Sequence, residues 1–180
     1  YTGRLEFLPF GKFKGKGDYK GGGLTREEKP KLAVGASYDF NNDAVKTRSN
    51  QGSYMTNDIG YYETNISTVF IDAIVNYKGF SFMGEYSNRD AEDPIAKNSD
   101  GSETGDLVSE GNGLNIQSGY LFKKNWELTG RYSFIDLKLS EISEQYTLGV
   151  SKYIVGHKLK VQSDISYLTL DDIGSEIRFR

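Results

Sequence analysis

The 180-residue chain contains no cysteine, one histidine and three prolines. The absence of cysteine excludes disulfides, thiolate metal sites and a thiol nucleophile. A single histidine, His157, argues against a Ser-His pair or a multi-histidine metal site within the chain. Long apolar runs are also missing, whereas a membrane-spanning helix needs about 20 predominantly apolar residues. The net charge of −3 does not indicate a basic surface for binding nucleic acid.

Aromatic residues, by contrast, are abundant. They make up 13% of the chain, and 13 of them are tyrosines, which is too many for a disordered polar segment. The length suits a single domain or a piece of a larger one. The chain opens on Tyr1, without an initiating methionine or a signal-peptide pattern, so we expect its start to be processed or missing.

Apolar and polar residues alternate with period two in stretches of about ten residues. From Lys31 to Phe40, one face reads Leu32, Val34, Ala36, Tyr38 and Phe40, and the other face is mostly polar or small. This pattern is typical of a strand with one apolar face. The same alternation predicts nine strands, at about residues 3–10, 31–40, 67–78, 80–89, 114–122, 126–134, 145–154, 159–167 and 175–180.

The connections between these strands alternate in length. Tight hairpin turns are predicted at 78–79, 123–125 and 155–157, where residues that tolerate turn dihedrals occur. Longer polar stretches lie at about 41–65, 91–111 and 137–144. Short turns at one end and long loops at the other are typical of an antiparallel, up-and-down transmembrane β-barrel.

Aromatic residues on the apolar face fall near both ends of the predicted strands. Tyr77, Phe80, Tyr120, Phe122 and Trp126 lie near the tight turns, and Phe40, Tyr86, Phe134, Tyr146 and Tyr167 lie near the opposite end. Two such bands around an aliphatic zone are typical of the interfacial girdles of a membrane barrel. The opposite face carries mid-strand charges, and a water-filled lumen accommodates these charges better than a dry core does.

Several segments resemble an outer-membrane porin family. They are Gly3–Gly11, Lys31–Phe40, Tyr77–Ser81 and the hairpin Gly156–Gln162 with the following Asp164–Leu168. On these segments, the chain resembles the C-terminal half of a phosphate-selective porin O and P family member of the Bacteroidota type.

The resemblance implies a 16-stranded barrel that assembles as a homotrimer and passes anions through a constricted pore. Residues 1–180 then form one partial barrel domain of about nine strands, with no second domain. The family's phosphate-binding residues are not carried over, because no matching arginine ladder occurs at the inward positions.

Charged residues at inward positions are the candidate pore lining. These are Asp72, Lys78, Glu85, Arg131, Lys160 and Asp164. A second candidate is the basic segment 11–29, which carries Lys12, Lys14, Lys16 and Lys20 and joins two strands at the tight-turn end. Folded into the lumen, it forms a basic constriction that favours anions. The alternative is a solvated turn at the periplasmic end.

Other features predict no chemistry. The acidic stretch 90–110 departs from the calcium-loop pattern and is interpreted as a solvated, mobile surface loop. His157 suits a turn, and Trp126 suits an interfacial anchor. No pair of acids is distinguished as a catalytic pair, so we assign no catalytic residue, metal or cofactor and expect no enzyme.

The leading hypothesis is an outer-membrane porin for small hydrophilic solutes, with anionic, phosphate-like ones among them. Its expected surroundings are outer-membrane lipid and lipopolysaccharide. One alternative is a non-conducting barrel subunit of a larger outer-membrane assembly, with its long loops as binding surfaces. A second alternative is a small eight-stranded barrel, whose interior is filled by side chains or holds a small cavity.

Overall fold

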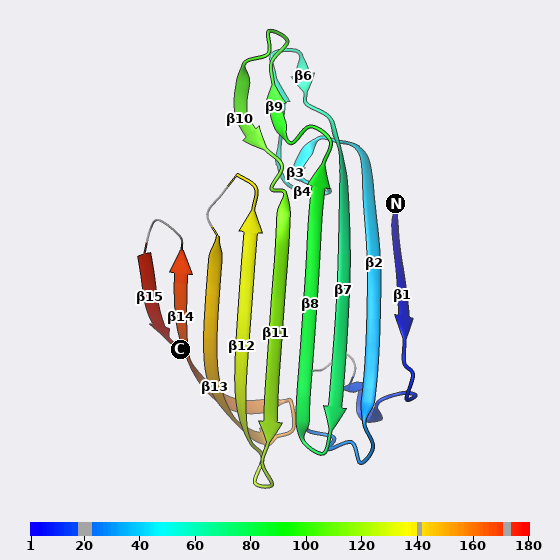
Figure 1. Ribbon diagram of the computed structural model, residues 1–180, viewed down its shortest axis with the longest axis vertical. Helices are drawn as coiled ribbons and strands as arrows, with labels where there is room; N and C mark the ends of the chain where they lie inside the picture. Colours follow the sequence, from blue (N-terminus) through cyan, green and yellow to red (C-terminus); the bar gives the residue numbers. More distant parts are fainter. Residues whose placement is uncertain (18–22, 140–141, 171–173) are drawn as a thin grey trace.

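The computed structural model describes residues 1–17, 23–139, 142–170 and 174–180. These residues form one large antiparallel sheet of nine strands and three short hairpins (Figure 1). The sheet contains β1 (Thr2–Phe7), β2 (Lys31–Ala44), β7 (Thr64–Tyr77), β8 (Phe80–Ala91), β11 (Gly111–Leu121), β12 (Trp126–Leu137), β13 (Ser143–Val155), β14 (Leu159–Leu170) and β15 (Gly174–Phe179). Each strand pairs with its neighbour in the order given, so the sheet is a simple meander.

The prediction of an antiparallel all-β meander with nine long strands is confirmed. The tight turns lie together at one end of the sheet with the described part of the β1–β2 connection, and the long connections 45–63 and 92–110 lie at the other end (Figure 1). In the first turn, Lys78 and Gly79 have φ angles of 48° and 92°. Two successive positive φ angles match a type I′ hairpin turn, which follows the twist of the paired strands.

The long connections are more ordered than the sequence predicted. They contain β3 (Lys46–Arg48), β4 (Gln51–Tyr54), β5 (Thr56–Asn57), β6 (Gly60–Tyr61), β9 (Ile95–Lys97) and β10 (Glu103–Leu107). Together, residues 44–62 and 91–110 form a folded cap above the sheet (Figure 1). The interpretation of 90–110 as a mobile loop is therefore replaced by a hairpin held against a second connection.

A small apolar core stabilises this cap. Met55, Ile66, Val108 and Ala96 have no exposed surface and pack with Ala44 and Ala91. Asp58 ties the two connections together, because it accepts hydrogen bonds from the backbone N–H (2.9 Å) and the hydroxyl of Ser99. Sequence patterning missed this core because its apolar residues are scattered through polar loops and meet only in three dimensions.

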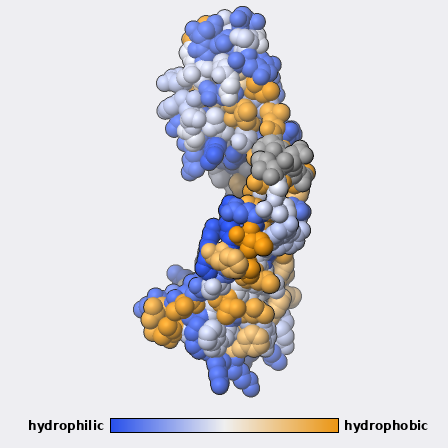
Figure 2. All heavy atoms as spheres, turned by 90° about the vertical axis from the view of Figure 1, so that its left-hand side faces the viewer, coloured by the Kyte–Doolittle hydropathy of each residue, from blue (hydrophilic) through white to orange (hydrophobic). Residues whose placement is uncertain are grey.

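The large sheet is curved, and its two faces differ. Figure 2 shows a molecule hollowed on one side. On β13, the apolar set Tyr146, Leu148 and Val150 is exposed, whereas Ser151 and Tyr153 of the opposite face are buried. The same holds for Leu128 and Glu127 on β12. We call the apolar side the convex face and the polar side the concave face.

The arrangement thus reverses that of a water-soluble sheet, in which the apolar face is covered. Exposed apolar side chains recur along the convex face, among them Val34, Tyr38, Ile71, Ile116, Leu128, Leu148, Val150, Val161 and Ile165. Contiguous exposed apolar surface of this extent is rare in soluble monomers and marks contact with a partner or a membrane.

Candidate functional site: the concave face

An ion-pair cluster crosses three strands of the concave face. Arg4 on β1 reaches over β2 to Asp72 on β7, with Nη1 to Oδ2 at 2.6 Å and Nη2 to Oδ1 at 2.9 Å. Arg4 also contacts Ser37 at 3.1 Å. The arginine passes over Gly35, where a Cβ atom would lie 2.3 Å from Arg4 Nη2. Glycine at this position therefore allows a bidentate pair to span the sheet.

The segment after β1 lies against the concave face at the tight-turn end. It contains the short helix η1 (Lys14–Lys16) and the buried side chain of Phe13. A Cβ atom at Gly17 would lie 3.4 Å from Nδ2 of Asn76, an inward residue of β7, and 3.4 Å from the side chain of Phe13. The buried carboxylate of Glu27 accepts the backbone N–H of Lys14 at 2.5 Å. These contacts place residues 13–17 and Glu27 on the concave side of the sheet, and the basic constriction formed by segment 11–29 stays a prediction.

Two further contacts fix the return of this segment to the sheet. The backbone N–H of Lys78 donates to the carbonyl of Glu27 at 2.8 Å, which joins the segment to the β7–β8 turn. Arg26 donates from Nη1 to the carbonyl of Leu121 at 2.9 Å and from Nη2 to that of Phe122. Arg26 and Glu27 therefore join the β7–β8 turn to the end of β11.

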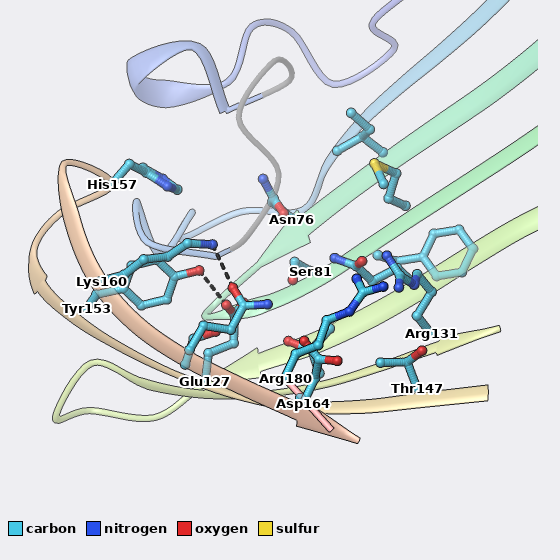
Figure 3. A pocket seen from close by; sticks show the side chains of 18 of the residues that line it. Asn76, Ser81, Glu127, Arg131, Thr147, Tyr153, His157, Lys160, Asp164 and Arg180 are labelled. Carbon is cyan, nitrogen blue, oxygen red and sulfur yellow. Dashed lines mark hydrogen bonds between the residues drawn. The ribbon is translucent and has the colours of Figure 1, made fainter. Parts of the chain in front are cut away.

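A cavity of about 650 Å³ lies on the concave face at this end (Figure 3). Its described lining comes from β7, β8, β11, β12, β13, β14 and the turn that holds His157. Within it, the Tyr153 hydroxyl donates to Glu127 Oε2 at 2.5 Å, and Lys160 Nζ donates to Gln162 Oε1 at 2.8 Å. Tyr153 and Glu127 lie on the neighbouring strands β13 and β12, whose register brings them together, whereas Lys160 and Gln162 are two positions apart on β14.

The structure places the predicted lining residues in three groups. Glu85, Arg131, Lys160 and Asp164 all border the cavity. Asp72 lies farther along the concave face and pairs with Arg4. Lys78 is located in the β7–β8 turn, where its ammonium group lies 5.3 Å from the centre of the Tyr77 ring. The ammonium group of Lys78 thus lies beside a convex-face residue and not beside the charged residues of the concave face.

The basic residues of segment 11–29 are placed only in part. Lys12, Lys14 and Lys16 are exposed, and Lys14 and Lys16 belong to η1. None of these three is among the described residues that border the cavity. Lys20 lies outside the described residues.

Sequence reasoning missed several residues of this face. Arg4 occupies an inward position of β1, and the alternation of that strand was a usable signal. Glu127 and Tyr153 were also at inward positions, but their contact depends on the β12–β13 register. Asn76 gave no signal, because its burial results from a segment more than fifty residues earlier in the chain.

The predicted aromatic bands occupy the convex face. Tyr77, Phe80, Tyr120, Phe122 and Trp126 are exposed near the tight turns; at the other end Tyr86, Tyr146 and Tyr167 are exposed and Phe40 and Phe134 are half-buried. On β12, Trp126 and Phe134 are separated by eight positions, which is about 27 Å along a strand. This length is comparable to the apolar band of outer-membrane barrels, about 25 Å tall.

Polar partners accompany both bands. Lys152 Nζ lies 5.2 Å from the centre of the Trp126 ring, as Lys78 does near Tyr77. At the cap end, the Tyr86 hydroxyl donates to Asn112 at 2.7 Å and the Tyr132 hydroxyl to Glu144 at 2.7 Å. Rings with an apolar body and a polar tip are the side chains that favour a membrane interface.

In the described ranges, no group of three or more His, Cys, Asp or Glu side chains is arranged to hold a metal ion. Within the same ranges, no helix has the length and hydropathy to cross a bilayer. Comparison with family models, curated proteins and solved structures found no match to this chain.

Proposed function

We propose that this chain is part of an outer-membrane β-barrel porin, through which small hydrophilic solutes diffuse along the concave face. The observation that carries the proposal is the reversed burial of the sheet, apolar on its exposed convex face and polar on its hollow side. Lipid is the environment in which an outward apolar face is stable, and a water-filled lumen is the environment that suits inward charges.

Closure of the barrel is part of the proposal. The outer edges of β1 and β15 carry no strand among the described residues. Since nine antiparallel strands separate these edges, β1 and β15 run in the same direction. Closure by antiparallel pairing therefore requires an odd number of further strands. Seven more strands, as the resemblance to 16-stranded porins implies, satisfy this condition, whereas direct pairing of β1 with β15 does not.

The proposed role involves no reaction on the solute. The ion pair of Arg4 with Asp72 and the cavity residues Glu85, Arg131, Lys160 and Asp164 set the electric field along the path. The proposal also includes an outer-membrane location, contact with lipid and lipopolysaccharide, and assembly as a homotrimer.

A second candidate function rests on the folded cap. Its connections are held by a core and expose Ile59, Tyr54 and Tyr61 at 80%, 51% and 58%. Such a surface favours a barrel subunit whose cap binds another protein in a larger assembly.

Conductance separates the two functions. The protein, purified as its gene encodes it and refolded in detergent, is added to a planar lipid bilayer. A porin produces stepwise conductance increases, whereas a non-conducting subunit produces none even though it inserts into vesicles and resists protease. Recovery in the aqueous fraction without detergent would contradict both.

A further inference from the structure

The cavity lining is dominated by neutral hydrogen-bonding side chains. Hydroxyl and amide groups come from Asn76, Ser81, Gln117, Thr129, Thr147, Ser151 and Gln162. Figure 3 shows Asn76, Ser81 and Thr147 on different strands around the same space. A volume of about 650 Å³ lies within the range of ligand sites, about 300–1,000 Å³. The space thus suits a small polar molecule that makes many hydrogen bonds.

Charges on the described lining are balanced. Arg131, Lys160 and Arg180 contribute three positive charges, and Glu85, Glu127 and Asp164 contribute three negative ones. The buried carboxylate of Glu127 is held in place by the Tyr153 hydroxyl. An anion in this space would meet no net attraction and would approach fixed carboxylates, which is costly at close range.

Unpaired polar atoms distinguish further between solute classes. Both Asn76 Nδ2 and Asn76 Oδ1, as well as Arg131 Nε, are buried without a hydrogen-bond partner. An anion without a hydroxyl group, such as chloride, accepts hydrogen bonds from the two nitrogens, but it has no proton for Oδ1. A hydroxyl group both donates and accepts. Asn76 borders the cavity, and a Cβ atom at Gly17 would lie 3.4 Å from its Nδ2 atom.

We infer that the solutes which this cavity recognises are uncharged and rich in hydroxyl groups, of the size of a mono- or disaccharide. The inference rests on the proposed pore and departs from the anionic solutes expected from the sequence. Selectivity arises from the neutral lining and the balanced charges of β7, β8 and β11–β14, and the exposed lysines of segment 11–17 add no net preference.

The test compares glucose with gluconate, which has a similar size and one negative charge. In liposomes that contain the intact protein, we expect swelling to be faster in glucose than in gluconate. In a planar bilayer with a potassium chloride gradient, we expect a reversal potential near zero. Equal or faster gluconate entry, or a marked anion preference that disappears in the Lys12→Gln, Lys14→Gln, Lys16→Gln variant, would overturn the inference.

Two variants probe the named atoms. Asn76→Leu should slow glucose entry and leave potassium chloride conductance unchanged, because an ion does not need the Oδ1 acceptor. Glu127→Gln should shift the reversal potential toward anions, whereas the matched Glu103→Gln in the exposed cap should not. If no channel forms at all, the proposed function fails; if channels form and the Asn76 variant transports glucose normally, only this inference fails.

Discussion

Gly35 shows how one residue controls contact between distant strands. Because Gly35 has no side chain, the Arg4 guanidinium can cross over it and bind Asp72. Any Cβ atom at this position lies 2.7 Å from Asp72 Oδ2 as well, so a larger residue displaces both partners. The pair is partly exposed, and pairs of this kind contribute modestly to stability unless their geometry is bidentate, as it is here.

The first prediction concerns this glycine. Gly35→Val should separate Arg4 from Asp72 and destabilise the attachment of β1 by about 1–2 kcal/mol. Hydrogen exchange of the β1 amides measures the effect directly. Gly3→Val, on β1 itself, is the control, because no atom lies within 4 Å of a Cβ there. Equal protection of β1 in both variants would contradict the prediction.

In the cap, Asp58 likewise joins two segments that are distant in the sequence. Hydrogen bonds from Ser99, first its hydroxyl and then its backbone N–H, lower the pKa of Asp58 below the ordinary value of 3.8. A carboxyl group with a lowered folded-state pKa stabilises the fold above its unfolded pKa and loses this contribution as the pH falls through the folded value. The junction between the two connections should therefore persist at neutral pH and weaken only in strong acid.

A carboxyl NMR titration checks this second prediction. The midpoint of Asp58 should lie below 3.8 in the native chain. It should return toward that value in Ser99→Ala, which removes the hydroxyl. A midpoint at or above the ordinary value in the native chain would show that the Ser99 contacts do not hold the carboxylate.

At the scale of elements, the cap and the sheet are stabilised by different forces. The cap has a compact apolar core around Met55, which has no exposed surface. The large sheet has ladder hydrogen bonds and polar contacts on its concave face, and its apolar side chains are exposed. Loss of a cap residue should therefore open the connections without opening the sheet.

Met55→Ala tests this third prediction. Removing a buried methionine side chain typically costs about 2–5 kcal/mol. We expect protease cleavage within residues 44–62 and faster exchange of cap amides, while exchange within β11–β13 stays unchanged. The control is Ile59→Ala, since Ile59 is 80% exposed. Simultaneous loss of cap and sheet protection in Met55→Ala would mean that the two are one cooperative unit.

At the scale of the whole molecule, the environment of the convex face is the decisive property. Leu148 is 62% exposed in the middle of β13. For a protein in water, a charged residue at so exposed a position is close to neutral. For a barrel in lipid, Arg or Lys near the bilayer midplane costs about 2–4 kcal/mol. A substitution of Leu148 by a charged residue is therefore expected to leave the stability nearly unchanged in water and to lower it in lipid.

The fourth prediction uses this contrast. Leu148→Arg should destabilise the protein in lipid vesicles by about 2–4 kcal/mol in a urea titration. Gln162→Glu, on the exposed concave side of β14, should have little effect, because its carboxylate meets water and still accepts the hydrogen bond from Lys160 Nζ. Equal stability of the two variants would remove the support for a lipid-facing convex surface.

The alternation of residues such as Leu32, Val34 and Tyr38 was enough to predict the strands, their number and the meander. A strand's two faces follow directly from the period of two, and tight turns such as Lys78-Gly79 set the pairing of their neighbours. The inward positions of Glu85, Arg131, Lys160 and Asp164 followed from the same rule, and all four border the cavity.

Only the tertiary structure decided which of these groups meet. Arg4 and Asp72 are 68 residues apart in sequence and pair across an intervening strand. Asn76 is buried beside Gly17, which precedes it by 59 residues, and Met55 packs in one core with Val108 of a separate connection. Local periodicity determines the direction of a side chain within its own strand, whereas contacts between distant segments depend on register, curvature and loop packing, which no short stretch of sequence encodes.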